Sequence, residues 1–366
     1  MNTFLECPCD ETQQQDLELS VASSLPWEEM DGKTVFITGA TGLVGSQLVK
    51  TLLACNRIRR TKIQVAALVR SKEKAKQVFG HLLERPELEL HYGDVTQSLN
   101  VEGPIDYIIH AASQTASKEF VTHPVETIDT AFIGTKNVLE LARNKKCESV
   151  VYVSSMEAYG NPGQLARRTG EKDLGYINNL NVRSCYSEGK RFCECLCSCY
   201  HSEHGVQAKI ARLAQTFGAG VSCTENRVFA QFAKAAMSGS DIVLHTQGKS
   251  FGNYCYTADV VTGLLTILLK GKNGEAYNVV CEAATMRIVE MAQMVSREIA
   301  NNKIQVVFDI PESAYVYGYA PDVELRLDGQ KLRSLGWEPK IAPNLRTMYQ
   351  RMIVSFQAQG FCAENP

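Results

Sequence analysis

Two residues four positions apart could do proton chemistry in this chain. Tyr186 and Lys190 lie in the segment Cys-Tyr-Ser-Glu-Gly-Lys-Arg, residues 185–191. On a helix, a spacing of four places both side chains on one face, so the ammonium group of Lys190 can lie beside the phenol of Tyr186. This positive charge is expected to favour the phenolate and to lower the pKa of Tyr186 toward neutrality. Such a phenol can take a proton from a hydroxyl group while hydride leaves the same carbon.

A glycine-rich turn lies upstream of this pair. Residues 39–45 read Gly-Ala-Thr-Gly-Leu-Val-Gly and follow an apolar run that is typical of a buried strand. The first glycine is expected to allow a tight turn from strand to helix, the second to let the backbone approach a pyrophosphate, and the third to permit close packing of the helix on the strand. Amide groups at the start of that helix would hold the phosphates. The expected contacts in the turn are Gly39, Thr41, Gly42, Leu43 and Gly45.

Residues at the ends of the following apolar runs extend the predicted dinucleotide site. Arg70 ends the second run, where an acid for the ribose hydroxyls of NAD is usual, so it favours the 2′-phosphate of NADP, with a solvated surface arginine as the alternative. Asp94 could accept a hydrogen bond from the adenine amino group. His110 is interpreted as structural, and the small residues after it admit the cofactor. The further expected contacts are Val95, Ala111 and Ala112.

Composition and charge exclude several classes of function. The chain has 366 residues, 45% of them apolar, and a formal charge of -2 from 38 basic and 40 acidic residues. Without a long basic run, neither a nucleic-acid footprint nor a polybasic membrane patch is indicated. No apolar run approaches membrane-spanning length and residues 1–10 lack the plan of a signal peptide, so we expect a cytoplasmic protein. The 13 cysteines form no paired Cys-x-x-Cys knuckles with nearby histidines, so we expect no metal site and free thiols in a reducing compartment.

Strands and helices alternate along the first part of the chain. The apolar runs that are typical of strands cover residues 33–38, 63–69, 88–92, 105–109 and 149–153. Segments with helical spacing of apolar residues separate them. This order predicts an α/β fold with a doubly wound, Rossmann-like parallel sheet. We expect a polar, flexible tail over residues 1–30, whose final part at residues 25–27 can pack on the domain. A dinucleotide-binding domain is expected over most of 31–215, and a smaller substrate-binding lobe over most of 216–366, with some late segments returning to the sheet.

Taken together, these motifs resemble those of one enzyme family. The motifs are the glycine turn, Gly-Asp-Val at 93–95, His-Ala-Ala at 110–112, Ser-Ser-Met-Glu-Ala-Tyr-Gly at 154–160 and the Tyr-x-x-x-Lys pair. They are similar to those of the extended short-chain dehydrogenases/reductases, and within them to the nucleotide-sugar epimerases, 4,6-dehydratases and UDP-glucuronate decarboxylases. Residues 183–191 are especially similar to the decarboxylases and their dehydratase relatives. The resemblance covers residues 32–350 and implies bound NAD(P), a nucleotide-linked sugar as substrate and a homodimer.

The resemblance also implies roles for individual residues. Tyr186 would be the base that starts oxidation at sugar C4, and Lys190 would hold the nicotinamide ribose, so both also belong to the cofactor site. Ser155 would hydrogen-bond the C4 oxygen. Glu157 matches a glutamate that removes the C5 proton in dehydratases, with an ordinary exposed glutamate as the alternative. The implied substrate contacts are Ser113, Gln215 and Arg227. Arg227 would contact the phosphate or uridine side of the substrate, with an ordinary surface charge on a helix as the alternative.

Four positions depart from the family pattern. Met156 stands where a 4,6-dehydratase carries the aspartic acid that protonates the departing C6 hydroxyl, and because a thioether cannot act as an acid, dehydration is disfavoured. Ala131 and Gln215 replace asparagines. Gly252 stands where an arginine commonly binds the substrate diphosphate. The identity of the substrate is therefore less constrained than the start of the reaction.

The motifs predict an NAD(P)-dependent enzyme that transiently oxidises C4 of a nucleotide-linked sugar. Decarboxylation at C5, as in UDP-glucuronate decarboxylases, is the first hypothesis, with C4 epimerisation or 4,6-dehydration as alternatives. An NADPH-dependent reductase, supported by Arg70, is a further alternative. A non-catalytic nucleotide-binding protein is the last one, supported by the missing arginine at Gly252. In every case, the expected ligands are small molecules rather than nucleic acid or membrane.

Overall fold

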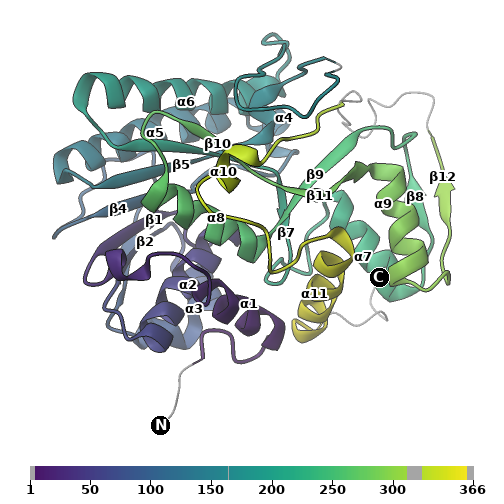
Figure 1. Ribbon diagram of the computed structural model, residues 1–366, viewed down its shortest axis with the longest axis horizontal. Helices are drawn as coiled ribbons and strands as arrows, with labels where there is room; N and C mark the ends of the chain where they lie inside the picture. The colour runs from purple at the N-terminus through teal and green to yellow at the C-terminus, as the bar shows by residue number, and fades with distance from the viewer. Residues whose placement is uncertain (1–4, 164, 311–323, 361–366) are drawn as a thin grey trace.

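The apolar runs identified above form a central parallel sheet. The computed structural model describes residues 5–163, 165–310 and 324–360, and within them seven parallel strands follow the order β10-β6-β5-β4-β1-β2-β3 (Figure 1). The strands are β1 (Thr34–Thr38), β2 (Gln64–Val69), β3 (Leu88–Tyr92), β4 (Tyr107–His110), β5 (Ser149–Ser155), β6 (Ala208–Leu213) and β10 (Ala276–Val279). The strand order reverses at the β1–β4 boundary, and the predicted doubly wound sheet is confirmed.

Helices cover both faces of this sheet because its strands carry apolar side chains on both sides. One face is covered by α2 (Leu43–Arg59), α3 (Lys72–Phe79) and α8 (Thr257–Lys270), and the other by α5 (Pro124–Lys145) and α6 (Ser184–His204). Along β1, Val35 and Ile37 face the first group of helices and Phe36 faces the second. The short helical elements in this part of the chain are η2 (Gly80–Glu84), α4 (Glu119–Thr122) and η3 (Met156–Tyr159).

A second, smaller group of elements lies beside the carboxyl ends of the strands (right side of Figure 1). Its strands are β7 (Gln215–Phe217), β9 (Phe251–Tyr256) and β11 (Cys281–Arg287) in one sheet, and β8 (Ile242–Leu244) and β12 (Val306–Phe308) in another. Its helices are α7 (Val228–Ser238), α9 (Ile288–Met294) with the π-helical turn Val295–Ile299, and α11 (Leu345–Ala358). They enclose a separate core around Phe217, Phe229 and Tyr349. The short helix α10 (Gln330–Arg333) returns to β10 of the main sheet.

The N-terminal segment is a docked element of the fold. Helix α1 (Glu11–Val21) begins after Asp10, whose carboxylate accepts a hydrogen bond from the amide of Gln13, and the 3-10 turn η1 (Trp27–Met30) follows it. Leu17, Val21 and Trp27 are buried in the main core. Helix α1 contradicts the expectation of a flexible tail, whereas the burial of Trp27 agrees with the expectation that the final part of the segment packs on the domain. Residues 1–4 lie outside the described part.

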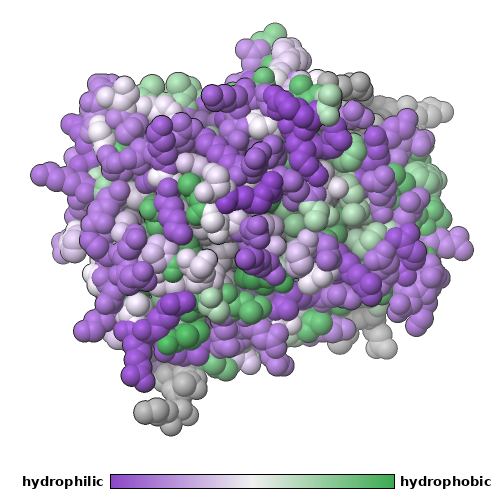
Figure 2. Space-filling model, viewed as in Figure 1, coloured by the Kyte–Doolittle hydropathy of each residue, from purple (hydrophilic) through white to green (hydrophobic). Residues whose placement is uncertain are grey.

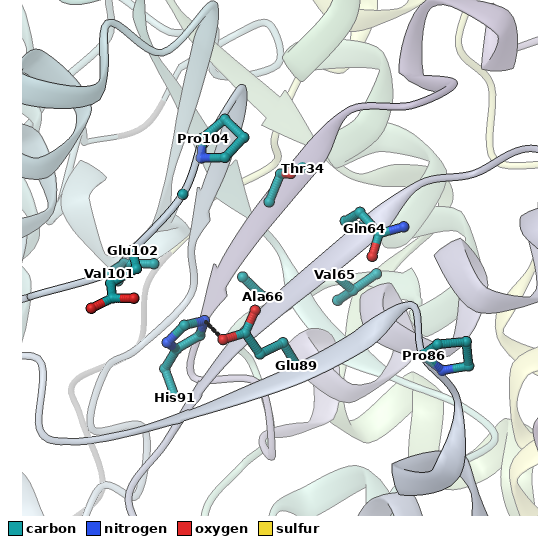
Figure 3. A pocket seen from close by; sticks show the side chains of 11 residues that line it. Thr34, Gln64, Val65, Ala66, Pro86, Glu89, His91, Val101, Glu102 and Pro104 are labelled. Atoms are coloured by element: carbon teal, nitrogen blue, oxygen red, sulfur yellow. Dashed lines mark ion pairs between the residues drawn. The ribbon is translucent and has the colours of Figure 1, made fainter.

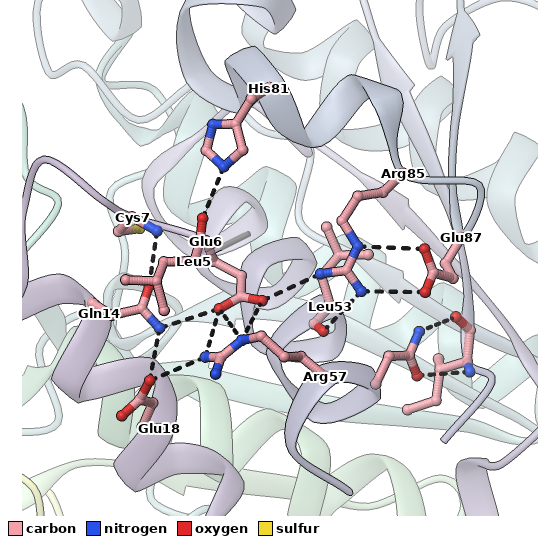
Figure 4. Close-up of polar contacts among 12 residues, drawn as sticks. Leu5, Glu6, Cys7, Gln14, Glu18, Leu53, Arg57, His81, Arg85 and Glu87 are labelled. Carbon is pink, nitrogen blue, oxygen red and sulfur yellow. Dashed lines mark hydrogen bonds and ion pairs between the residues drawn. The ribbon is translucent and has the colours of Figure 1, made fainter. Parts of the chain in front are cut away.

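Buried polar contacts hold this segment to distant parts of the chain. The side chain of Glu6 is fully buried and lies 2.9 Å from Arg57 and 3.3 Å from Arg85 (Figure 4). Asp16 pairs with Arg351 of α11 and accepts a hydrogen bond from the hydroxyl of Tyr256. Arg57 and Arg351 are 51 and 335 residues away from their partners. Because these partners are remote in the sequence, the sequence alone does not show that the polar residues of this segment are buried, and they resemble those of a solvated tail.

Membrane-spanning helices, metal-binding clusters and disulfides are each absent from the described residues. In the described ranges, no helix combines the length and the apolar character that a membrane crossing needs. The same residues contain no cluster of three or more His, Cys, Asp or Glu side chains that could hold a metal ion. All twelve cysteines in this part of the chain are free thiols. Figure 2 shows that the face seen in Figure 1 is mostly hydrophilic, with small, separate apolar patches.

Candidate active site

The glycine turn joins β1 to α2 and brings two strand ends together. Gly39 has a φ of +65°, which favours glycine, and a Cβ there would lie 2.7 Å from the backbone of Ala111 and Ala112. A Cβ on Gly45 would lie 2.2 Å from the carbonyl oxygen of Gly39. Both positions therefore need glycine for packing, and the two alanines that follow β4 lie directly against the turn.

Helix α2 begins with an open stretch of backbone. Gly42 is its N-cap and supplies no capping side chain, and a Cβ there would meet only the Gly39 carbonyl oxygen, at 3.2 Å. The first amides of a helix and its dipole attract a phosphate. Thr41 and Leu43 flank Gly42, and Leu43 packs against the core of the second lobe. The turn therefore lies where the two lobes meet, and its residues fit the pyrophosphate of a dinucleotide.

Arg70 and Asp94 lie next to each other at the ends of β2 and β3. The guanidinium of Arg70 lies 3.7 Å from the Asp94 carboxylate, and its side chain is 71% exposed. The amide and hydroxyl of Thr96 donate to Asp94 at 2.9 and 2.8 Å. Although burial raises the pKa of Asp94, these hydrogen bonds and the charge of Arg70 hold it below its usual value. Val95, the next residue, packs on Gly134 of α5, where a Cβ would lie 2.8 Å from it.

His110 is enclosed by two threonines at the end of β4. Its Nδ1 lies 2.7 Å from the hydroxyl of Thr38, and its Nε2 lies 3.2 Å from that of Thr135. Burial lowers the pKa of His110 to about 3, and the charge of Lys190 acts in the same direction. The imidazole is thus neutral and ties β1, β4 and α5 together, which is a structural role.

Three of the expected catalytic residues meet at the end of β5. The hydroxyl of Ser155 accepts a hydrogen bond from the amide of Glu157 at 3.2 Å, and it lies near enough to the phenol of Tyr186 to lower the pKa of that group. The half-buried ring of Tyr186 stacks on Phe120 of α4, with centroids 4.4 Å apart and an angle of 11°. The fourth residue, Lys190, lies one helical turn further along α6. This arrangement places a hydroxyl, a carboxylate and a phenol side by side.

The expected effect of Lys190 on Tyr186 is wrong for this structure. Burial raises the pKa of Tyr186 to about 12, and the charge of Glu157 raises it further, against the Ser155 hydrogen bond and the charges of Arg227 and Arg183. The ammonium of Lys190 donates to the carbonyl of Val153 at 2.8 Å and lies 5.6 Å from the centre of the Tyr186 ring. Its own pKa is lowered to about 8 by burial.

An ion pair between Glu157 and Arg183 was not predicted from the sequence. The two nitrogens of the Arg183 guanidinium lie 3.0 and 3.3 Å from the two carboxylate oxygens, and the hydroxyl of Ser187 donates to the same carboxylate at 3.3 Å. The guanidinium also lies 5.8 Å from the centre of the Phe120 ring. The available signal was the position of Arg183, three residues before Tyr186, which puts both on one helix face.

The expected substrate contacts lie on separate elements. Arg227 pairs with Glu225 at 2.8 Å, and its charge reaches the phenol of Tyr186. Gln215 begins β7 and is paired in register with Tyr254 of β9. Ser113 donates to the carbonyl of Gln114 at 3.1 Å. Arg227 is thus a partly exposed residue paired within its own segment, and the roles of Arg227, Gln215 and Ser113 in binding substrate stay predictions.

The positions that depart from the family pattern are filled by packing. Met156 packs against the main core. Ala131 of α5 faces Gly189 of α6, where a Cβ would lie 3.3 Å from the Ala131 methyl group. At Gly252, a Cβ would lie 2.5 Å from the ring and hydroxyl of Tyr254, so this ring takes the space of a side chain. None of the three offers an ionisable group to the site.

A cavity between the sheet and the loop at 101–104 lies away from this site (Figure 3). It is lined by residues of β1, β2 and β3, among them Thr34, Gln64 and His91. Thr34 and Gln64 begin their strands, whereas the glycine turn follows the last residue of β1. The cavity therefore belongs to the opposite end of the sheet.

Comparisons with known proteins agree with this geometry. The model of the NAD dependent epimerase/dehydratase family matches residues 35–280. UDP-glucuronic acid decarboxylase 3 of Arabidopsis thaliana is 32% identical over 309 residues, which are 84% of each chain. UDP-glucuronic acid decarboxylase 1 of Danio rerio is 29% identical over 89% of this chain and 75% of its own.

Solved structures share the fold at lower identity. The UDP-glucose 4-epimerase of Thermotoga maritima, solved with UDP-glucose, has a TM-score of 0.73 at 19% identity and covers 90% of this chain and 100% of its own. The dTDP-glucose 4,6-dehydratase of Bacillus anthracis, solved with NAD, has a TM-score of 0.70 at 18% identity and covers 89% of this chain and 97% of its own.

Proposed function

Because this chain belongs to the NAD-dependent epimerase/dehydratase family of enzymes, we propose that it decarboxylates a nucleotide-linked uronic acid, with UDP-glucuronate as the first substrate to test. The observation that carries this proposal is the 32% identity, over 84% of both chains, to a UDP-glucuronic acid decarboxylase. The grouping of Glu157 with Ser155 and Tyr186 supports it. Met156 also supports it, because it offers no acid to a departing hydroxyl.

Oxidation at C4 of the sugar needs a base. Tyr186 takes the proton of the C4 hydroxyl, and Ser155 hydrogen-bonds the C4 oxygen. When bound, NAD⁺ would supply the hydride acceptor and an added positive charge. This added charge matters because burial raises the pKa of Tyr186 to about 12, which leaves the phenol protonated at neutral pH. The ammonium of Lys190, one helical turn away, holds the nicotinamide ribose.

The resulting 4-ketone makes C5 the site of bond breaking. The bond between C5 and the carboxylate carbon breaks, its electron pair moves toward the ketone oxygen, and carbon dioxide leaves. C5 then takes a proton that comes from solvent water, either directly or through Glu157 once its carboxylate has been protonated. Return of the hydride to C4 completes a reaction that is redox-neutral overall, so no further oxidant or reductant is consumed.

The test is the mass of the sugar product. Purified protein incubated with UDP-glucuronate and NAD⁺ should give a UDP-pentose and carbon dioxide, and Tyr186→Phe should give neither while still binding the cofactor. Loss of water from a nucleotide-linked hexose would instead identify a dehydratase, and inversion at C4 without a change of mass an epimerase. In a parallel incubation with NADPH in place of NAD⁺, oxidation of NADPH in proportion to product would identify a reductase. Absence of turnover with UDP-, dTDP-, GDP- and CDP-sugars would favour a non-catalytic binding protein.

For the cofactor, we propose that the site accepts NADP as well as NAD and slightly prefers it. The guanidinium of Arg70 is exposed at the end of β2, where it can meet a 2′-phosphate. Its present partner, Asp94, lies at 3.7 Å, which is a loose ion pair at the surface. Ser71, the residue after Arg70, is the N-cap of α3, so the first turn of that helix lies next to Arg70 in the chain.

For the assembly, we propose a homodimer through the outer face of α5 and α6. Large apolar side chains are exposed on α4, α5 and α6, namely Val121, Val125, Ile128, Phe132 and Phe192. Phe132 and Phe192 meet edge to face with centroids 5.2 Å apart, so they join the two helices into one apolar surface. A second copy, which the family resemblance also implies, would cover this surface.

The remaining assignments follow from the same observations. We propose that the second lobe, which comprises most of residues 216–366 apart from the segments that return to the main sheet, binds the nucleotide-linked sugar, with Arg227 as a contact to its phosphate or uridine side. We also propose a cytoplasmic location, because the described thiols are all free, as is usual in a reducing compartment. Fractionation of cells that express the tagged protein would test the location.

A further inference from the structure

We propose that Arg183 sets the specificity of this site for acidic sugars by binding the carboxylate on C5, and that it exchanges its ion pair with Glu157 for this contact. The inference rests on the proposed function for the orientation of the sugar. In the free protein, Arg183 pairs with Glu157, and in the complex it would pair with the carboxylate of the substrate instead.

The first observation is the place of Arg183 beside the phenol. It directly precedes α6, three residues before Tyr186. Its guanidinium lies 5.8 Å from the centre of the Phe120 ring, and that ring stacks on Tyr186 at 4.4 Å. Its charge lowers the pKa of Tyr186 against the larger effect of burial. A fixed cation therefore lies within electrostatic reach of the atom that meets the C4 oxygen.

The second observation is the partner that Arg183 already holds. Glu157 offers a carboxylate to both terminal nitrogens of the guanidinium, at 3.0 and 3.3 Å. The planar fork of arginine matches a carboxylate in this two-point geometry. The two side chains are 28% and 29% exposed, so this ion pair is in contact with solvent and can open at modest cost. The site thus contains a carboxylate-binding fork next to its base.

The third step is the shape of a uronic acid. Its carboxylate is bonded to C5, which is bonded to C4, so the carboxylate lies within a few ångströms of the C4 oxygen held by Tyr186 and Ser155. Glu157 lies in the same neighbourhood, because its amide donates to the hydroxyl of Ser155 at 3.2 Å and its carboxylate accepts from the hydroxyl of Ser187, the residue after Tyr186, at 3.3 Å. When Arg183 turns to the substrate carboxylate, Glu157 is released beside C5, where a proton is needed after carbon dioxide leaves.

The physical consequence is a preference in binding. Because the new contact replaces the one that Arg183 makes with Glu157, only the difference between the two adds to affinity. We therefore expect a preference of about tenfold, the lower end of what a hydrogen bond between charged groups gives. A neutral hexose cannot make this contact. Because the carboxylate departs as neutral carbon dioxide, the contact weakens as the bond breaks, so it acts on binding of the substrate rather than on the chemical step.

The experiment measures affinities in a protein that cannot turn over. In the Tyr186→Phe background, with NAD⁺ bound, calorimetry compares UDP-glucuronate with UDP-glucose. The starting protein should favour the acid by about tenfold, and Arg183→Gln should remove this preference, whereas Arg183→Lys should keep part of it. Glu157→Gln should tighten binding of the acid alone, because it removes the competing carboxylate. A merely structural ion pair would not give that increase.

Arg227→Gln is the matched control. The charge of Arg227 also acts on Tyr186, but the Arg227→Gln variant should bind both ligands equally more weakly and leave the ratio of their affinities unchanged. A retained preference in Arg183→Gln, or weaker binding of the acid in Glu157→Gln, would overturn the inference. This outcome can be told apart from a failure of the proposed function. A binding preference that depends on Arg183, without release of carbon dioxide, would refute only the proposed reaction. Release of carbon dioxide without that preference would refute only the role of Arg183. Cofactor affinity of each variant reports whether the fold is intact.

Discussion

The replacement of Glu6 by glutamine is expected to destabilise the protein far more than a similar change next to it. The side chain of Glu6 is fully buried and faces two arginines, Arg57 at 2.9 Å and Arg85 at 3.3 Å. Gln14 donates to the same carboxylate at 3.1 Å. Removal of one partner from a buried ion pair costs ~3–5 kcal/mol because the remaining charges stay desolvated. Arg57 and Arg85 each keep a second carboxylate, so we expect ~3 kcal/mol.

Glu18→Gln is the control because it changes the same chemistry in a different environment. Glu18 lies 3.0 Å from Arg57, which is the same distance within 0.1 Å, but its side chain is 45% exposed. An exposed pair contributes less than about 1 kcal/mol. Urea unfolding followed by the fluorescence of Trp27, which is buried in the same segment, gives both free energies. Equal losses for the two variants would refute the reasoning, as would a loss below about 1 kcal/mol for Glu6→Gln.

Three further predictions concern the cofactor, the assembly and acid stability. Arg70→Ala should weaken binding of NADP⁺ more than that of NAD⁺ in calorimetry, and equal losses would remove Arg70 from the cofactor site. Light scattering should give the mass of two chains, and Phe192→Glu, which places a charge on the apolar face, should give the mass of one; a single-chain mass for the unmodified protein would contradict the dimer. Burial and the charge of Lys190 lower the pKa of His110 from 6.5 to about 3. Between these pH values, only the unfolded chain binds a proton at His110. The free energy of unfolding should therefore fall as the pH drops from 6.5 toward 3, by up to about 1.4 kcal/mol per pH unit. His110→Asn should lose this part of the acid dependence of the urea midpoint, whereas an unchanged profile would assign it to other groups.

The parts of the fold that were predictable from the sequence are set by local patterns. Apolar runs and helical spacings indicate the strands and helices of the sheet because each depends on residues a few positions apart. The turn at 39–45 was predictable for a similar reason: Gly39 and Gly45 are required by close backbone approaches within the turn itself and to the next strand end. The helix spacing of Tyr186 and Lys190 also follows from local geometry.

The parts that were not predictable depend on remote partners. The segment at 5–30 is buried through contacts such as Asp16 with Arg351, whereas its sequence has the polar composition of a tail. The pKa of Tyr186 follows from burial and from the charge of Glu157, 29 positions earlier in the chain, rather than from the lysine four residues later. The pairing of Glu157 with Arg183 spans 26 residues and two elements. Desolvation and tertiary pairing leave no periodic signal in a sequence.

The contact between Asp16 and Arg351 has a consequence for how the protein folds during its synthesis on the ribosome. At about 5–20 residues per second, the 335 residues between these partners take roughly 17 to 67 seconds to synthesise. Through that interval, α1 has emerged without its acceptor on α11, and Leu17 and Val21 can rest only on the elements already made. Completion of this contact is therefore among the last steps of folding.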